Sequence, residues 1–267
     1  MDLQLNGKRA LITGSSGGIG EGIAKVFAKE GTTVVIHGRN KTNAERVANE
    51  IKDNGGTAYV ALGDLSTDDA ASKVSSIAMS VTGGIDILVN NAADYKNRSW
   101  ADSTPDEWAE LYNLNVLSAV RMIRYIMPQM KKNGWGRIIQ ISSGEATQPF
   151  AFMPDYAATK AALNNLTVSL SKELANSGIT SNTISPGIIV TSSLEKFYRE
   201  TAAKRGWGSD WNVIEKHVIE EILYNPVGRL GTIDDVANLV VFVASPLASY
   251  INGANLRVDG GSVVTVN

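Results

Sequence analysis

The sequence predicts an α/β protein of one domain, a doubly wound parallel sheet of about seven strands with helices on both faces. Two observations support this fold class. Short continuous apolar runs alternate with longer amphipathic stretches, which is typical of a parallel sheet covered on both faces. The 267 residues contain no internal repeat, low-complexity tract or interdomain linker, so residues 1–267 are expected to form a single domain.

Seven short stretches, most of them rich in valine, isoleucine or leucine, have strand patterns. They cover about residues 9–12, 33–37, 57–62, 85–90, 136–141, 180–185 and 255–258. Apolar residues recur with the helical period in eight longer stretches between and after these runs. The predicted helices cover about residues 18–30, 42–53, 67–81, 105–131, 156–175, 193–204, 212–222 and 232–244.

The turn after the first strand is rich in glycine, with Gly14, Gly17, Gly18 and Gly20 inside seven residues. Glycines let the backbone approach a phosphate closely, and the N–H groups at the start of the next helix can bind it. The spacing differs from the commoner G-x-G-x-x-G pattern, and an ordinary glycine-rich turn is the alternative. The position between strand and helix favours a nucleotide site in a Rossmann-type fold.

Tyr156 and Lys160 are four residues apart on a predicted helix, so their side chains share one face. A free tyrosine titrates near ~10, too high for proton transfer at neutral pH. A lysine ammonium about 6 Å away, at an effective dielectric of about 20, favours the phenolate by ~3 kcal/mol, or about two pKa units. The pair therefore suits general acid–base catalysis, although a solvated helix face often carries the same two residues.

Two predicted strands end in small polar residues, the fourth in Asn90 and Asn91 and the fifth in Ser142 and Ser143. In open parallel sheets, ligands bind at the carboxyl ends of the strands. The two serines alternate in direction along the strand, so only one of them can face such a ligand.

Taken together, these motifs make the chain similar to the short-chain dehydrogenase/reductases over essentially its whole length, including members like 3-oxoacyl-carrier-protein reductase. Thr13 to Gly20 matches the family's T-G-x-x-x-G-I-G, and residues 90–92 match N-N-A-G except for Ala93 in place of glycine. Ser143 lies thirteen residues before Tyr156, a typical family separation. The remaining matches are Asn115 on its helix, Pro186-Gly187 with Thr191, and the C-terminal segment 258–261.

The resemblance implies the roles of the site residues. Tyr156 is the expected general acid–base, Ser143 rather than Ser142 hydrogen-bonds the substrate carbonyl, and Lys160 binds the nicotinamide ribose while lowering the pKa of Tyr156. Asn115 is expected to hold a water that passes protons through Lys160, although a mid-helix asparagine can be a tolerated polar residue. The expected cofactor-binding residues are Gly14, Ser16, Gly18, Ile19, Gly20, Arg39, Asp64, Leu65, Asn91, Tyr156, Lys160, Pro186, Gly187 and Thr191.

The second strand bears on the choice of cofactor. No carboxylate occurs from Val34 until Glu45, whereas an acid near this strand end would bind the ribose hydroxyls of NAD. Arg39 is placed to contact a 2′-phosphate, so the sequence favours NADP(H), with NAD(H) as the alternative. Asp64 is expected to face the adenine by resemblance, and a cap before the third helix is the equal alternative.

Composition narrows the function classes. Lys and Arg total 25 against 27 Asp and Glu, so no charge bias points to nucleic acid or a membrane surface. Zero cysteines exclude disulfides and thiolate chemistry, and the two histidines suggest no metal site. Residues 1–8 lack the apolar core of a signal peptide, so a cytoplasmic location is expected. The resemblance also implies a homotetramer built on residues 105–131, 156–175 and the C-terminal strand.

The substrate is expected to be a small carbonyl or alcohol compound. Phe150, Phe152 and Met153 suggest an apolar cavity for a hydrophobic ketone, a secondary alcohol or a 3-oxoacyl thioester. Glu145 and Asp94 are the polar residues most able to bias this choice. Residues 191–225 are expected to form a helical lid, whose aromatic residues face a ligand, the lid's own core or another subunit: Phe197, Tyr198, Trp207 and Trp211.

Two other functions remain as alternatives. A lyase or epimerase would use the nucleotide transiently, but such relatives have a larger C-terminal region. A redox sensor would bind NADP without turnover, but such proteins typically lose the tyrosine or the lysine.

Overall fold

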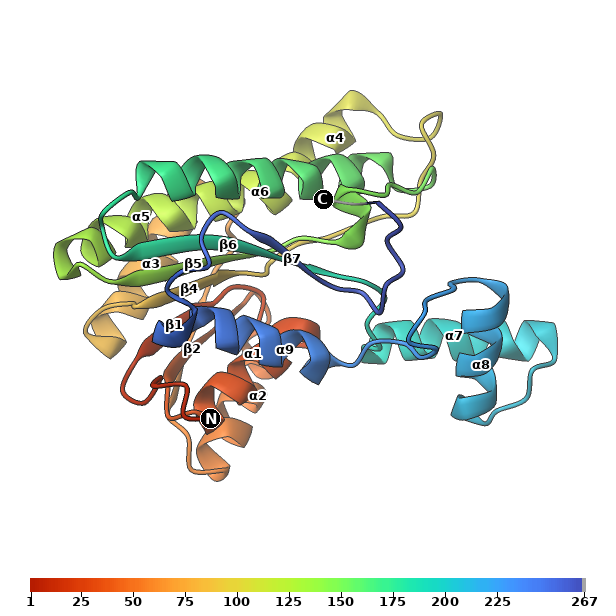
Figure 1. Cartoon of the computed structure of the whole chain (residues 1–267), viewed down its shortest axis with the longest axis horizontal. Coiled ribbons are helices and arrows are strands. Elements are labelled where there is room, and N and C mark those ends of the chain that lie inside the picture. The colour runs from red at the N-terminus through yellow and green to blue at the C-terminus, as the bar shows by residue number, and fades with distance from the viewer. Residues whose placement is uncertain (266–267) are drawn as a thin grey trace.

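The computed structural model describes residues 1–265 and contains one seven-stranded parallel sheet (Figure 1). The strand order is β3-β2-β1-β4-β5-β6-β7. The strands are β1 (Arg9–Ile12), β2 (Thr33–Gly38), β3 (Ala58–Leu62), β4 (Ile87–Asn90), β5 (Gly136–Ile141), β6 (Ile179–Pro186) and β7 (Asn255–Val258). The predicted doubly wound sheet is confirmed, and each strand lies within a few residues of its predicted bounds.

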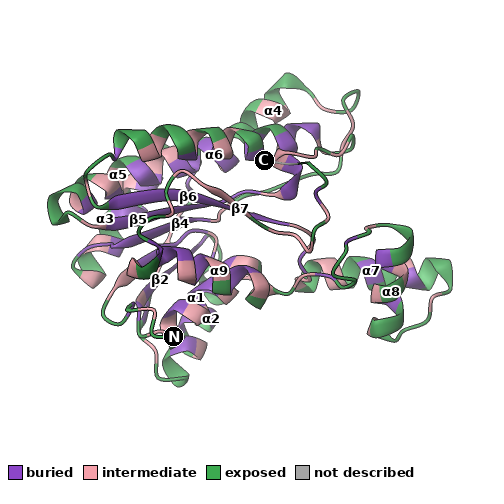
Figure 2. Cartoon of the chain, in the orientation of Figure 1, coloured by how far each residue is buried: buried purple, intermediate pink, exposed green. Residues whose placement is uncertain are grey.

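Helices cover both faces of this sheet (Figure 1). One face carries α1 (Gly18–Lys29), α2 (Lys41–Asp53) and α9 (Ile233–Ala244). The other carries α3 (Asp68–Thr82), α5 (Ser118–Asn133) and α6 (Pro154–Glu173). Each face has its own apolar cluster, and the central strands between them are buried while the outer sides of the helices are exposed (Figure 2). The continuous apolar strands are explained by this burial on both sides.

The direction of winding reverses beside β1. The chain runs outward from β1 through β2 to β3, and then returns to place β4 on the other side of β1. Leu11 of β1 is therefore paired with Val35 of β2 and with Leu88 of β4. Such a switch point leaves a crevice at the carboxyl ends of the strands, where doubly wound proteins bind ligands.

The helix predicted over residues 105–131 is interrupted. It consists of α4 (Pro105–Tyr112), a π-helical segment (Asn113–Leu117) and α5. The prediction of one regular helix is wrong here, because its period cannot reveal one extra residue in a turn. Single π-helical turns are frequent at functional sites, and this one contains Asn115.

The segment 191–225 projects from the body of the protein (Figure 1). It contains α7 (Ser192–Arg205) and α8 (Trp211–Glu221). These helices form a separate apolar cluster made of Tyr198, Ala202, Ile214, Val218, Ile219 and Leu230. The segment thus has its own small core next to the main domain.

Candidate active site

The turns that follow β1 and β4 are held together by Thr13 and Asn91. The Thr13 hydroxyl accepts hydrogen bonds from the amides of Asn91 (2.9 Å) and Ala92 (3.0 Å). The Asn91 side-chain amide donates to the carbonyls of Thr13 (2.9 Å) and Gly14 (3.1 Å). Asn91 therefore holds the glycine turn in its conformation through these hydrogen bonds. Its position at a strand end predicts this role only in part.

The glycine turn has the close packing that a phosphate site requires. Gly14 and Gly18 have φ values of 66° and 56°, which favour glycine. A Cβ on Gly20 would lie 2.5 Å from the Asn91 amide nitrogen and 2.6 Å from the Gly14 carbonyl. Helix α1 starts at Gly18, so its first N–H groups face the same crevice, while the Ile19 side chain packs against the core.

His37 supports this turn from the end of β2. Its Nδ1 accepts a hydrogen bond from the Gly14 amide (3.0 Å), and its Nε2 lies 3.2 Å from the Gly63 carbonyl. Burial lowers the pKa of His37 to about 4, which keeps the ring neutral. These contacts give His37 a structural role, and its bond to Gly14 had no signal in the sequence.

The end of β2 lies close to the glycine turn. A Cβ on Gly38 would be 2.5 Å from the Ser16 hydroxyl, and Arg39 follows with an exposed side chain. Farther along, the Asp64 carboxylate accepts a hydrogen bond from the Ser66 amide (3.0 Å), but Thr67 caps α3, so the capping alternative for Asp64 is wrong. Leu65 is buried, and its carbonyl accepts from Arg121 (3.0 Å). The expected contacts of these residues with a cofactor stay predictions.

The segment after β6 closes the opposite side of the crevice. Pro186 ends β6, and a Cβ on Gly187 would lie 2.8 Å from the Asp259 Cα, so the segment runs tightly against the chain after β7. Thr191 caps α7 by accepting a hydrogen bond from the Leu194 amide (3.3 Å). Its methyl carbon lies 3.9 Å from the position of a Cβ on Gly18. Thr191 and the glycine turn, distant in sequence, therefore face each other.

Tyr156 and Lys160 occupy the first turns of α6, next to the end of β5. The Lys160 Nζ lies 5.4 Å from the centre of the Tyr156 ring and donates a hydrogen bond to the Ile141 carbonyl (2.8 Å). The Ser142 hydroxyl donates to the Lys160 carbonyl (3.0 Å), so Ser142 has a structural role. The Ser143 hydroxyl accepts from the Glu145 amide (3.2 Å) and lies beside the Tyr156 hydroxyl.

Burial controls the protonation of both groups. It raises the pKa of Tyr156 above its usual value, and the neighbouring Ser143 hydroxyl opposes this shift. It lowers the pKa of Lys160 to about 8. The prediction that Lys160 brings the pKa of Tyr156 down toward neutrality is wrong in direction. Loss of hydration at the phenol, which the sequence does not reveal, is the largest influence on this pKa, and Lys160 is not among the groups that shift it.

Asn115 braces the loop that follows β4. Its Oδ1 accepts a hydrogen bond from the Asp94 amide (2.9 Å), and its Nδ2 donates to the Asp94 carbonyl (2.9 Å) and the Thr159 hydroxyl (3.1 Å). Both ends of the side-chain amide are engaged by the protein, so the predicted water would have to share them. The π-helical turn directs this side chain toward Asp94 and α6.

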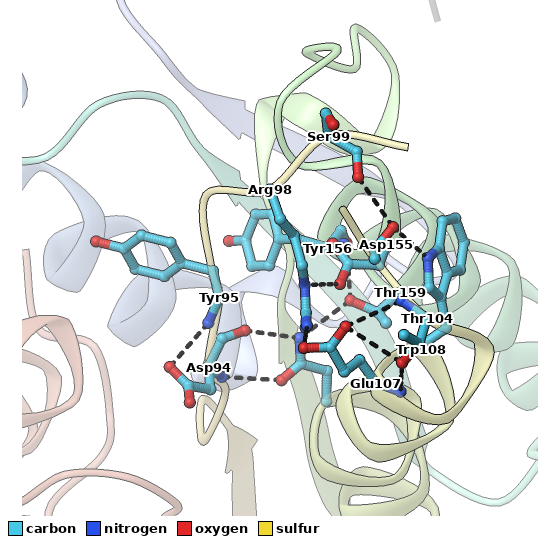
Figure 3. Close-up of polar contacts among 12 residues, drawn as sticks. Asp94, Tyr95, Arg98, Ser99, Thr104, Glu107, Trp108, Asp155, Tyr156 and Thr159 are labelled. Carbon is cyan, nitrogen blue, oxygen red and sulfur yellow. Dashed lines mark hydrogen bonds and ion pairs between the residues drawn. The ribbon is translucent and has the colours of Figure 1, made fainter. Parts of the chain in front are cut away.

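The same loop is fixed at a second point by Arg98 (Figure 3). The Arg98 guanidinium pairs with Asp155 (2.9 Å) and Glu107 (2.6 Å). Asp155 also accepts a hydrogen bond from the Tyr156 amide (2.8 Å), and the Tyr95 ring meets the Tyr156 ring edge-on with centres 5.9 Å apart. Sequence reasoning missed Arg98 and Asp155; the one signal was an acid in the first turn of the helix, directly before Tyr156.

A cavity of about 490 Å³ extends from Ser143 toward the end of the projecting segment. Its walls include Glu145, Phe150 and Tyr224. Burial raises the pKa of Glu145 to about 7. The predicted apolar wall is found in part. Phe150 lines the cavity, whereas Phe152 is half exposed and stacks on the Phe150 ring with ring centres 5.1 Å apart.

The aromatic residues of segment 191–225 mostly pack within this segment. Tyr198 is buried in the core of the segment, and Trp207 stacks on His217 with ring centres 4.8 Å apart. Trp211 packs against the same core and lies below the Arg199 guanidinium (5.4 Å). Of the three alternatives for these residues, the structure favours the segment's own core. Phe197 is half exposed.

A glycine turn at the switch point, together with a half-buried tyrosine and a buried lysine at the strand ends, defines the class of dinucleotide-dependent dehydrogenases and reductases. The family signature of short chain dehydrogenases matches residues 8–202. The chain therefore belongs to the short-chain dehydrogenase family. It is an NAD(P)-dependent oxidoreductase that interconverts a carbonyl group and an alcohol.

Individual relatives span the whole chain. The 7α-hydroxysteroid dehydrogenase of Escherichia coli is 34% identical, with 100% of this chain and 98% of the relative covered. A 3-oxoacyl-[acyl-carrier-protein] reductase of Aquifex aeolicus is also 34% identical, with coverage of 98% and 99%. The crystal structure of L-sorbose reductase from Gluconobacter frateurii, complexed with NADPH and L-sorbose, is 35% identical with a TM-score of 0.93 and full coverage of both chains.

Proposed function

We propose that this protein reduces a ketone to a secondary alcohol, with Tyr156 as the proton donor. The observation that carries this proposal is the position of Tyr156 between Ser143 and Lys160 at the strand ends. Because burial raises the pKa of Tyr156, the phenol is protonated at neutral pH, which suits proton donation to a carbonyl oxygen.

The residues of the crevice fit a dinucleotide. The glycine turn leaves no room for a side chain at Gly20, so its backbone can approach phosphates closely. When bound, the reduced nicotinamide supplies the hydride. Gly14, Gly18 and Gly20 would hold the pyrophosphate, and Asn91, Pro186, Gly187 and Thr191 would border the nicotinamide half.

Side chains of the protein supply the proton and stabilise the charge that its transfer leaves behind. Ser143 donates a hydrogen bond to the substrate carbonyl oxygen, and Tyr156 transfers its proton to the same oxygen. The positive charge of Lys160 stabilises the phenolate that this transfer leaves behind. Asn115 keeps the loop after β4 in place and fixes the register of the π-helical turn against α6.

NADP(H) is the proposed cofactor, with NAD(H) as the alternative. Ser16 and Arg39 border the same space at the end of β2, and both suit a 2′-phosphate. The similar L-sorbose reductase was crystallised with NADPH. Titration of the protein with NADPH and NADH, followed by nicotinamide fluorescence, is expected to give tighter binding of NADPH. The Arg39→Ala variant should lose most of that preference; tighter binding of NADH by the unmodified protein would refute the role of Arg39.

The reaction class is tested with a panel of carbonyl compounds in the presence of NADPH. The panel contains L-sorbose, a 7-oxo steroid and a 3-oxoacyl thioester, which correspond to the substrates named for the relatives, and a simple cyclic ketone. A fall in nicotinamide absorbance selects the reductase. Conversion of substrate without a net change in absorbance would select a lyase or epimerase, and cofactor binding without conversion would select a sensor.

A homotetramer is part of the same proposal. Leu117 and Val168 on the helices expected to form the interface are exposed, whereas Met122, expected there too, belongs to the protein's own core. Ala162 and Leu166 are half buried. Gel filtration with light scattering is expected to give four chains per particle, and a stable monomer would reject this assignment.

A cytoplasmic location is proposed on composition alone, since a chain without cysteine needs no oxidising compartment. Within residues 1–265, no helix has both the length and the apolar character that crossing a bilayer requires.

A further inference from the structure

We propose that Glu145 selects the substrate by hydrogen-bonding a hydroxyl group next to the reacting carbonyl, so that hydroxyketones are preferred over plain ketones. This inference deepens the proposed function and rests on it. It assigns a substrate class to the cavity and a specific role to Glu145, which the sequence marked only as a polar residue able to bias the choice of substrate.

The position of Glu145 ties it to the reacting carbonyl. It belongs to a single 3-10 turn, Gly144–Ala146, that Ser143 caps. The Glu145 amide donates to the Ser143 hydroxyl (3.2 Å), and the Glu145 carboxyl is close enough to Tyr156 to raise the pKa of its phenol. A substrate whose carbonyl oxygen sits between Ser143 and Tyr156 therefore presents its adjacent carbons to Glu145.

One oxygen of the Glu145 carboxyl group lacks the partner that buried acids normally have. The residue is 8% exposed, and among residues 1–265 its Oε2 has no hydrogen-bond partner. Buried carboxyl groups in folded proteins are nearly always paired or hydrogen-bonded. Glu145 also lines the cavity that begins at Ser143, so a bound molecule can offer its carboxyl group a hydrogen bond that the protein does not supply.

The protonation of Glu145 suits a hydroxyl partner. Burial raises its pKa to about 7, and the Phe150 amide partly opposes this shift. Near neutral pH the group therefore occurs both as a carboxylate and as an acid, and each form can bond a hydroxyl, as acceptor or as donor. A plain ketone offers nothing to this carboxyl, and burying it unpaired penalises such a substrate.

The test compares 2-hydroxycyclohexanone with cyclohexanone, which differ only in the hydroxyl next to the carbonyl. With NADPH, the unmodified protein is expected to show the larger kcat/KM for the hydroxyketone. Glu145→Leu should lower that value roughly 10- to 100-fold, mainly through KM, and should lower it more than the kcat/KM for cyclohexanone. Glu145→Gln keeps a hydrogen-bonding side chain of the same shape and should retain most of the preference.

Each outcome decides between the two proposals. NADPH binding without reduction of either ketone would overturn the proposed function itself. Reduction of both ketones with a ratio that Glu145→Leu does not change would overturn only the role of Glu145. If Glu145→Leu fails to fold, as judged by NADPH binding and thermal unfolding, the unmodified protein still decides, because a preference for cyclohexanone contradicts the inference.

Discussion

Loss of hydration raises the pKa of Tyr156 and lowers the pKa of Lys160, and this makes the reaction sensitive to alkaline pH. The phenol stays protonated well above neutrality, whereas Lys160, with a pKa of about 8, loses its charge as the pH rises through that value. Ketone reduction needs the protonated phenol and the charged amine. We therefore expect kcat for reduction to be constant below pH 8 and to fall by up to about tenfold per unit above it.

The reverse reaction is expected to respond in the opposite sense. Oxidation of the alcohol requires the deprotonated Tyr156, so its rate should rise with pH over the range in which reduction falls. Steady-state rates in both directions over the same pH series provide the measurement. A reduction rate that increases above pH 8 would contradict this assignment of proton donor and cation.

His37 gives a pH dependence of stability rather than of turnover. Its pKa is about 4 in the folded protein and near ~6.5 when unfolded, so the unfolded chain binds the extra proton first. The full contribution is present above pH ~6.5 and is lost as the pH falls to about 4, a change of roughly 3 kcal/mol. Denaturant unfolding over this pH range should show that the free energy of unfolding depends less steeply on pH in His37→Asn than in the unmodified protein. Equal slopes for the two proteins would refute the claim.

Among the structural elements, the glycine turn has a steric requirement at Gly20 and none at Gly17. A Cβ at Gly20 would lie 2.5 Å from Asn91, whereas one at Gly17 would meet nothing within 4 Å on an extended backbone. Gly20→Ala should weaken NADPH binding by roughly tenfold or more, because Asn91 and the turn must move. Gly17→Ala is the matched control and should bind normally; equal affinities of the two variants would contradict the geometry.

The loop after β4 and helix α6 are joined by a buried ion pair. Asp155 is 1% exposed and pairs with the Arg98 side chain, which is 8% exposed. Asp155→Ala should lower the free energy of unfolding by about 3 kcal/mol, because a buried charge loses its partner. The Glu173→Ala variant, which breaks the exposed pair with Lys131, should leave the denaturation midpoint unchanged. Similar effects of both substitutions would show that the buried pair has no special role.

At the scale of the whole molecule, the sequence was sufficient to predict the architecture but not the environment of the site residues. Short continuous runs of apolar residues predicted most of the seven strands, because strands that are buried on both faces of a sheet have few polar residues. Apolar periodicity predicted one regular helix where Asn115 occupies a π-helical turn, because periodicity does not resolve a single extra residue. Pairing of Arg98 with Asp155 depends on a loop conformation, and local sequence carries no such information.

The direction of the Tyr156 pKa shift illustrates the same limit. Spacing placed Lys160 near Tyr156, and the structure confirms their proximity. Spacing could not show how far the surrounding protein removes water from the two polar groups, and this desolvation decides the sign of the pKa shift. The aromatic residues of segment 191–225, likewise, were visible in the sequence, but only the packing of α7 against α8 shows that Tyr198 belongs to a separate core.

The most direct test of the account is NADPH oxidation by the Tyr156→Phe variant, measured together with its affinity for NADPH. Loss of the hydroxyl removes the proton donor without changing the ring, so turnover should fall by at least about a hundredfold while cofactor binding is preserved. Tyr95→Phe, which alters the neighbouring ring that meets Tyr156 edge-on, should remain active. A Tyr156→Phe protein that keeps most of its activity would contradict the central claim.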